Sequence, residues 1–85
     1  MQVYDFYAPW CIPCKRILPS VERFSTEENI PLLKINVEDN RKKFDQFGVK
    51  TVPTLILVNE REEEIKRVIN PKNIEEIRKG FSLKS

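Results

Sequence analysis

The feature that most constrains this chain is a pair of cysteines, Cys11 and Cys14, which follows a short apolar run and opens a helical pattern. Residues 3–7 are rich in β-branched and aromatic side chains, as expected of a strand buried on both faces. The exposed N–H groups and the positive dipole end of a helix favour an anion, and a thiolate is one. The C-x-x-C spacing also allows a disulfide to form and break within one turn. The sequence therefore predicts a dithiol–disulfide redox site.

Zinc binding is the main alternative use of such a pair. A structural zinc ion needs four ligands, and the sequence has no histidine and no cysteine besides these two. One chain therefore cannot complete a zinc site, although a site shared between two chains remains an alternative. We expect a redox pair with no metal and no cofactor.

Length and charge indicate one small soluble domain, residues 1–85, and we expect a monomer. The net charge of +2 is too close to neutral to indicate a nucleic-acid partner. No apolar run approaches the roughly 20 residues of a membrane span. The first expected strand begins almost at Met1, and we expect no signal peptide ahead of it. A reducing, cytoplasmic location follows as an expectation, and there a lone cysteine pair is more often catalytic than structural.

The hydrophobic pattern predicts the element order βαβαββα. Strands are expected at residues 2–7, 32–37, 54–58 and 64–69, and helices at 11–26, 40–47 and 71–81. Asn40 is expected to cap the second helix, Gly48 to end it, and Asn70-Pro71 to open the third. A strand, a helix and a second strand form a parallel βαβ unit with a right-handed crossover, so the fold class is α/β.

The cysteines differ in their expected roles. Cys11 lies nearer the helix end, so its thiolate is better stabilised, and we expect it to act as the nucleophile while Cys14 stays buried. Attack on a substrate disulfide gives a mixed disulfide, and Cys14 then attacks Cys11 to release the reduced product. Pro13 suits the first helical turn because its missing N–H would have had no partner there.

Asp5 is the exception within an apolar strand. It is either a solvent-facing edge residue or a buried carboxyl whose raised pKa would make it a candidate proton acceptor for Cys14. A third interpretation is that Asp5 only organises buried water. Lys34, in the neighbouring expected strand, is either a partner of Asp5 or an ordinary solvated residue.

Three stretches, taken in order, resemble the thioredoxin family. They are Y-D-F-Y-A-P-W-C-I-P-C-K, K-I-N-V-E-D-N and F-G-V-K-T-V-P-T-L-I-L-V. The resemblance implies a thioredoxin-like fold whose four-stranded mixed sheet has strand order 2-1-3-4 and helices on both faces. It implies a protein-disulfide reductase whose partners are disulfide-containing proteins and an electron donor, either a thioredoxin reductase or glutathione.

The resemblance also implies roles for single residues. Asp5 would accept the proton of Cys14, with Lys34 as its partner. Pro53 would be cis and face the cysteines, leaving the backbone of Thr51 and Val52 to pair with an extended substrate peptide. In addition, Trp10 would offer an apolar docking surface, beside Ile12 and Pro13.

The chain departs from the family pattern in several places. Ile12 stands between the cysteines where the family usually has glycine, and Ile69 stands where a glycine usually lines the substrate groove, which we expect to be narrower here. The strand and helix that usually precede the redox strand are absent from this sequence. In length the chain is similar to glutaredoxins, but it lacks their Pro-Tyr and Gly-Gly motifs. Two alternatives stay open: a glutaredoxin-type enzyme reduced by glutathione, and a non-enzymatic binding subunit with incidental cysteines.

Overall fold

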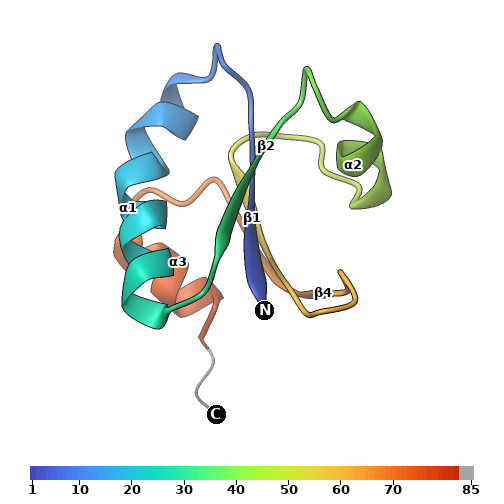
Figure 1. Ribbon diagram of the computed structural model, residues 1–85. Coiled ribbons are helices and arrows are strands. Elements are labelled where there is room, and N and C mark those ends of the chain that lie inside the picture. Colours follow the sequence, from blue (N-terminus) through green and yellow to red (C-terminus); the bar gives the residue numbers. More distant parts are fainter. Residues whose placement is uncertain (83–85) are drawn as a thin grey trace.

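The computed structural model describes residues 1–82 and contains the predicted order of strands and helices (Figure 1). Residues 83–85 of the expected domain lie outside the described residues. The elements are β1 Gln2–Tyr7, α1 Ile12–Glu28, β2 Leu32–Asn36, α2 Arg41–Gln46, β3 Thr54–Val58, β4 Glu64–Ile69 and α3 Ile74–Gly80. Within the described chain, no helix is long and apolar enough to cross a membrane.

The four strands form one mixed sheet in the order β2-β1-β3-β4, which confirms the expected topology. The β1 strand pairs in parallel with β2 and antiparallel with β3, and β4 is antiparallel to β3. Figure 1 shows α1 and α3 on one face of the sheet and α2 on the other. The carboxyl ends of β1 and β2 therefore lie at the same edge of the sheet, beside the start of α1.

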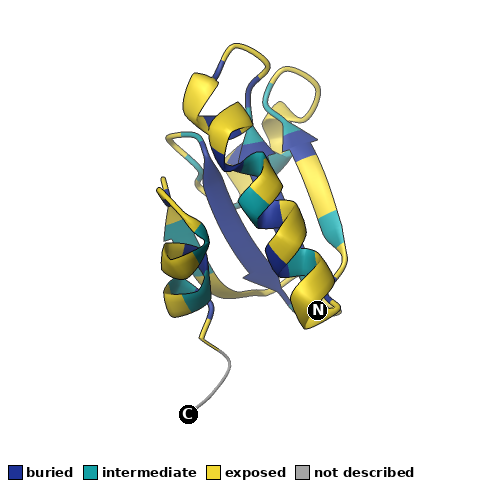
Figure 2. Ribbon diagram, turned by 90° about the vertical axis from the view of Figure 1, so that its left-hand side faces the viewer, coloured by how far each residue is buried: buried dark blue, intermediate teal, exposed yellow. Residues whose placement is uncertain are grey.

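Each face of the sheet has its own apolar core. The α1/α3 side contains buried side chains of both helices and of the central strands: Val3, Ile17, Val21, Phe24, Ile30, Leu55, Leu57, Ile77 and Phe81. The α2 side is built around aromatic residues: Tyr4, Phe6, Ile35, Phe44, Ile56 and Val58. All of β3 is buried, whereas β2 is largely exposed at the sheet edge, as Figure 2 shows. Leu33 of this strand is 43% exposed, whereas Ile35 is buried.

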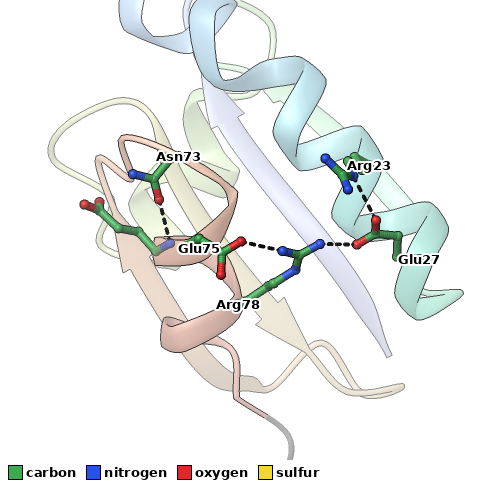
Figure 3. Close-up of polar contacts among 6 residues, drawn as sticks. Arg23, Glu27, Asn73, Glu75 and Arg78 are labelled. Atoms are coloured by element: carbon green, nitrogen blue, oxygen red, sulfur yellow. Dashed lines mark hydrogen bonds and ion pairs between the residues drawn. The ribbon is translucent and has the colours of Figure 1, made fainter.

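Helices α1 and α3 are joined by an ion-pair chain at the surface (Figure 3). Glu27 accepts hydrogen bonds from Arg78 (2.6 Å) and from Arg23 (2.8 Å), and these bonds lower the pKa of its carboxyl. Arg78 also binds Glu75 at 2.5 Å. These contacts connect the helix that opens with the cysteines to the helix that packs beside it.

One of the expected helix starts is wrong. The third helix begins after Asn73, whose side chain accepts a hydrogen bond from the Glu76 N–H (3.0 Å), and not at Asn70-Pro71. Asn70 has a left-handed φ of 52°, and its N–H donates to the Pro53 carbonyl (2.9 Å), so the chain is still in a turn there. Asn40 does occupy the N-cap position of α2, but its side chain makes no cap hydrogen bond.

The end of α2 follows the expectation. Gly48 has a φ of +63°, a backbone conformation in which a glycine pays no steric penalty, and it directly follows the C-cap residue Phe47.

Candidate active site

Cys11 and Cys14 form a disulfide at the N-terminus of α1, with their Cα atoms 5.3 Å apart. Cys11 is the N-cap residue, with an extended backbone, and its Sγ accepts a hydrogen bond from the Cys14 N–H (3.2 Å). A Cys11 thiolate in the reduced protein would meet the same N–H and the positive end of the helix dipole. Each cysteine is 4% exposed, so the difference between them lies in their helix positions and not in their burial.

Asp5 is buried in the middle of β1, 2% exposed, so the solvent-facing interpretation is wrong. Its Oδ1 has no hydrogen-bond partner among the described residues. Desolvation by burial raises the pKa of this carboxyl to about 6, with the charge of Lys34 lowering it and that of Glu22 raising it. A carboxyl with such a pKa can hold or release a proton near neutral pH.

A small cavity connects Asp5 to the cysteine pair. Its volume is about 110 Å³, and it lies on the α1 side of the sheet. The lining residues are Asp5, Tyr7, Ala8, Pro9, Cys14, Lys15, Leu18 and Lys34. Asp5 and Cys14 therefore face the same space, which is large enough to hold water between them.

Lys34 lies directly opposite Asp5 in the parallel β1–β2 register. It is exposed and lines the same cavity, and no ion pair joins it to Asp5 in the part of the chain that the structure describes. Its influence on Asp5 is electrostatic, acting through the space of the cavity.

The second cavity is a cleft of about 540 Å³ on the α2 side of the same sheet edge. It is lined by Trp10, Val37, Arg41, Phe44, Asp45, Val49, Lys50, Thr51 and Val52. Trp10 is 68% exposed in the turn before Cys11, which excludes plain core packing for its side chain. The bond between Val52 and Pro53 is cis, as the resemblance implied, and Pro53 is buried at the start of β3.

Ile12 and Ile69 are among the most exposed large apolar side chains, at 65% and 56%. Ile12 lies on the first turn of α1 beside exposed Pro13. Ile69 ends β4, opposite Thr54, and the next residue, Asn70, is hydrogen-bonded to Pro53. A third cleft of about 100 Å³ lies between the first turns of α1 and the segment after β4. It is lined by Pro13, Arg16, Ile17, Asn70, Pro71 and Lys72. Ile69 is not among its lining residues.

The structure also brings residues to the site that the sequence patterns did not single out. Val37 packs, together with Val52, against the cluster of Ala8, Cys11 and Cys14. A signal for Val37 was present: it follows a strand parallel to β1, and the carboxyl ends of adjacent parallel strands meet at one edge. Of the cations that line the two clefts, Arg41 belongs to the basic run of residues 41–43, whose default interpretation is solvated surface, and Arg16, Lys50 and Lys72 belong to no motif in the sequence.

Within residues 1–82 no cluster of histidine, cysteine, aspartate or glutamate could hold a metal ion.

Comparison with known proteins gives a consistent result. The thioredoxin family model matches residues 1–82. The thioredoxin of Haemophilus influenzae is 45% identical over 56 residues, which cover 64% of this chain and 52% of that protein. The thioredoxin of Chlamydia caviae is 39% identical over 70 residues, covering 81% of this chain and 68% of that protein. The chain thus spans between about half and two thirds of the length of these curated relatives.

Solved structures show the same similarity. Thioredoxin 1 from Thermosipho africanus superposes with a TM-score of 0.83 at 30% identity, covering 96% of this chain and 91% of that one. The oxidized form of mitochondrial thioredoxin 3 from Saccharomyces cerevisiae superposes with a TM-score of 0.81 at 27% identity, covering 95% and 76%.

Proposed function

This chain belongs to the thioredoxin family, and from that premise we propose that it is a thiol–disulfide oxidoreductase that reduces disulfide bonds in protein substrates. One observation carries the proposal most strongly. The disulfide lies in the first turn of α1 with Cys11 as the N-cap, and the buried carboxyl of Asp5 lines the cavity behind Cys14. In this proposal Cys11 is the nucleophile, Cys14 the resolving thiol and Asp5 the proton acceptor.

The reaction has two steps in this proposal. In the reduced protein, the Cys11 thiolate attacks one sulfur of the substrate disulfide, a mixed disulfide forms, and the other substrate sulfur leaves as a thiolate that takes up a proton. Cys14 then gives its proton to Asp5, and its thiolate attacks the Cys11 sulfur; this breaks the mixed disulfide and releases the second substrate sulfur as a thiolate that takes up a proton from water. Two electrons pass from the protein dithiol to the substrate, and the protein ends in the disulfide form found in the structure.

The surroundings of Cys11 supply substrate contacts. The exposed side chains of Trp10, Ile12 and Pro13 provide an apolar surface next to Cys11, and exposed Ile69, opposite Thr54, is a further candidate contact. The segment of Thr51 and Val52 borders the larger cleft, and in this proposal its backbone pairs with an extended segment of the substrate.

An external electron donor must regenerate the dithiol. The family implies a thioredoxin reductase, and glutathione is the second candidate; either requires a reducing compartment such as the cytoplasm. The non-enzymatic binding subunit is disfavoured, because such a role gives no reason for a buried carboxyl behind the cysteine pair.

The test uses single cysteine variants with a disulfide-bonded protein as substrate. We expect Cys14→Ser to accumulate a covalent adduct of both proteins, linked through Cys11, because the resolving step is removed. Cys11→Ser should form no adduct. Intact-mass spectrometry with peptide mapping measures both results. Normal turnover by Cys14→Ser, or an adduct on another residue, contradicts the two-cysteine mechanism.

The electron donor is assigned by a second measurement. The wild-type disulfide is incubated with NADPH and a thioredoxin reductase, or with NADPH, glutathione and glutathione reductase, and NADPH consumption is followed. Turnover with the first system supports the family assignment. Turnover only with the glutathione system supports the glutaredoxin-type alternative.

A further inference from the structure

The two open clefts that flank the cysteine pair both carry exposed cations. Arg41 and Lys50 line the larger cleft on the α2 side, and Arg16 and Lys72 line the smaller cleft on the α1/α3 side. Among the described residues, one acidic side chain, Asp45, shares the larger cleft, and the smaller cleft has no acidic lining residue.

Some other cations on the surface are held in ion pairs. Arg23, Lys43, Arg67 and Arg78 are each bound to a glutamate. Across residues 1–82, the side chains of the four cleft cations make no ion pair or hydrogen bond, although the Glu76 carboxylate accepts a hydrogen bond from the Lys72 backbone N–H.

Several acidic side chains lie at the other end of the sheet. The run Glu62 to Glu64 lies in and after the β3–β4 turn, and Glu27 lies near the C-terminal end of α1. In Figure 1 both regions lie at the end of the sheet opposite the first turn of α1. Glu38 and Asp39 follow β2 at the cysteine end, but they line neither cleft.

The two clefts lie at opposite ends of one short backbone segment. Thr51 and Val52 border the larger cleft, whereas Asn70, hydrogen-bonded to the Pro53 carbonyl, borders the smaller one. Cys11 also lies between the two clefts, because Trp10, just before it in the chain, lines the larger cleft and Pro13, two residues after it, lines the smaller one. A chain crossing this edge of the sheet past Cys11 would therefore meet a pair of cations before the sulfur and a second pair after it.

We propose that the clefts receive an extended segment of the substrate protein that carries acidic side chains on both sides of its disulfide-bonded cysteine. The inference rests on the proposed function and adds the class of substrate. Because exposed charge pairs are weak and screened by salt, the cations act mainly on the rate of productive encounter, and the preference is strongest at low ionic strength.

The test compares three synthetic disulfide-linked peptides in which the cysteine is flanked by glutamate, glutamine or lysine. Each kcat/KM is divided by the rate of the same variant with hydroxyethyl disulfide, a neutral probe of thiol–disulfide exchange itself. For the wild type, we expect the glutamate peptide to exceed the lysine peptide by roughly tenfold at low salt. The ratio should approach one at about 1 M salt, where the Debye length is shortest.

Matched double variants locate the effect. Arg41→Gln with Lys50→Gln, and Arg16→Gln with Lys72→Gln, should each lower the glutamate-to-lysine ratio by about threefold. Arg61→Gln with Lys79→Gln removes the same charge from two exposed residues that line neither cleft, and should keep the wild-type ratio.

The outcomes distinguish the substrate preference from the redox function. If hydroxyethyl disulfide reacts but the three peptides react equally, the substrate preference is wrong and the redox function stands. An equal loss of preference in the control double variant would assign the effect to net charge and overturn the role of the clefts. If no disulfide reacts, the proposed function fails, and the substrate class with it.

Discussion

Asp5 is the single residue on which the proposed chemistry makes the strongest demand, because it is a buried carboxyl without a complete set of partners. Burial raises its pKa from 3.8 to about 6. Between these values the folded protein holds a proton that the unfolded chain has released, so stability falls as the pH rises through this range. Above the folded pKa the full cost is present. It amounts to about 3 kcal/mol, because a difference of one in pKa between the folded and unfolded states is worth roughly 1.4 kcal/mol.

Asp5→Asn should therefore raise the free energy of unfolding by up to about 3 kcal/mol at about pH 8 and change it little at about pH 4. Urea denaturation of the oxidised protein at both pH values measures the difference. Asp39→Asn, at an exposed position after β2, serves as the control and should match the wild type at both. If Asp5→Asn changes the stability equally at both pH values, the pKa of the carboxyl does not differ between the folded and unfolded states, and the raised pKa is contradicted.

Other residues show how far sequence reasoning reaches at this scale. The strand pattern predicted that Asp5 would be unusual, because a charged side chain interrupted an apolar run. It left the burial undecided, since this depends on α1 covering that face of β1. The positions of Arg41 and Lys50 at one cleft could not be predicted, because they come from separate segments that only the tertiary fold brings together.

At the scale of elements, the two asparagine N-caps allow a direct comparison. Asn73 caps α3 through a hydrogen bond to the Glu76 N–H, whereas Asn40 holds the same position in α2 without a side-chain bond. Asn73→Ala should lower the free energy of unfolding by about 1 kcal/mol, and Asn40→Ala by only a few tenths. Thermal or urea melts of both variants provide the measurement. Equal losses would mean that the side-chain hydrogen bond does not set the stability of α3.

The start of α3 is also where the sequence misled. An asparagine followed by proline favours a cap and a first turn, but Asn70 adopts a left-handed conformation and binds Pro53 through its N–H. The better signal was Asn73 with Glu76 three residues later, the spacing of a capping box. In the structure, Glu76 also accepts a hydrogen bond from the Lys72 N–H at 2.9 Å. The hydrogen bond from the Asn70 turn to Pro53 could not be predicted from the local sequence, because the two residues are far apart in the chain.

At the scale of the molecule, the sheet order and the division of helices between its faces agreed with the sequence and its family resemblance. The reason is physical: β3 is a continuous apolar run that needs cover on both faces, and the βαβ unit fixes the hand of the crossover. The cysteine cluster shares Val37 and Val52 with the aromatic core on the α2 side. This contact could not be predicted, because it depends on how the strand ends and loops pack around the cysteines.

The sheet separates valine methyl groups that contact the cysteine cluster from valine methyl groups that do not. Val37 and Val52 contact the cysteine cluster and also belong to the rim of the aromatic core on the α2 side. Val3 and Val21 lie in the other core, across the sheet. Breaking the disulfide should therefore change the chemical environment of the first two valines and leave the other two nearly as they were.

Methyl-resolved NMR spectra of the oxidised and reduced protein, with valines labelled, give the measurement. Val37 and Val52 should show the largest shift changes, and Val3 and Val21 should stay close to their positions. Equal shifts on both sides would mean that the sheet does not isolate the two cores. If the shifts differ as expected, the methyl groups of two partly buried valines report the oxidation state of each molecule, and a spectroscopist could follow the reaction with no label at the sulfur atoms.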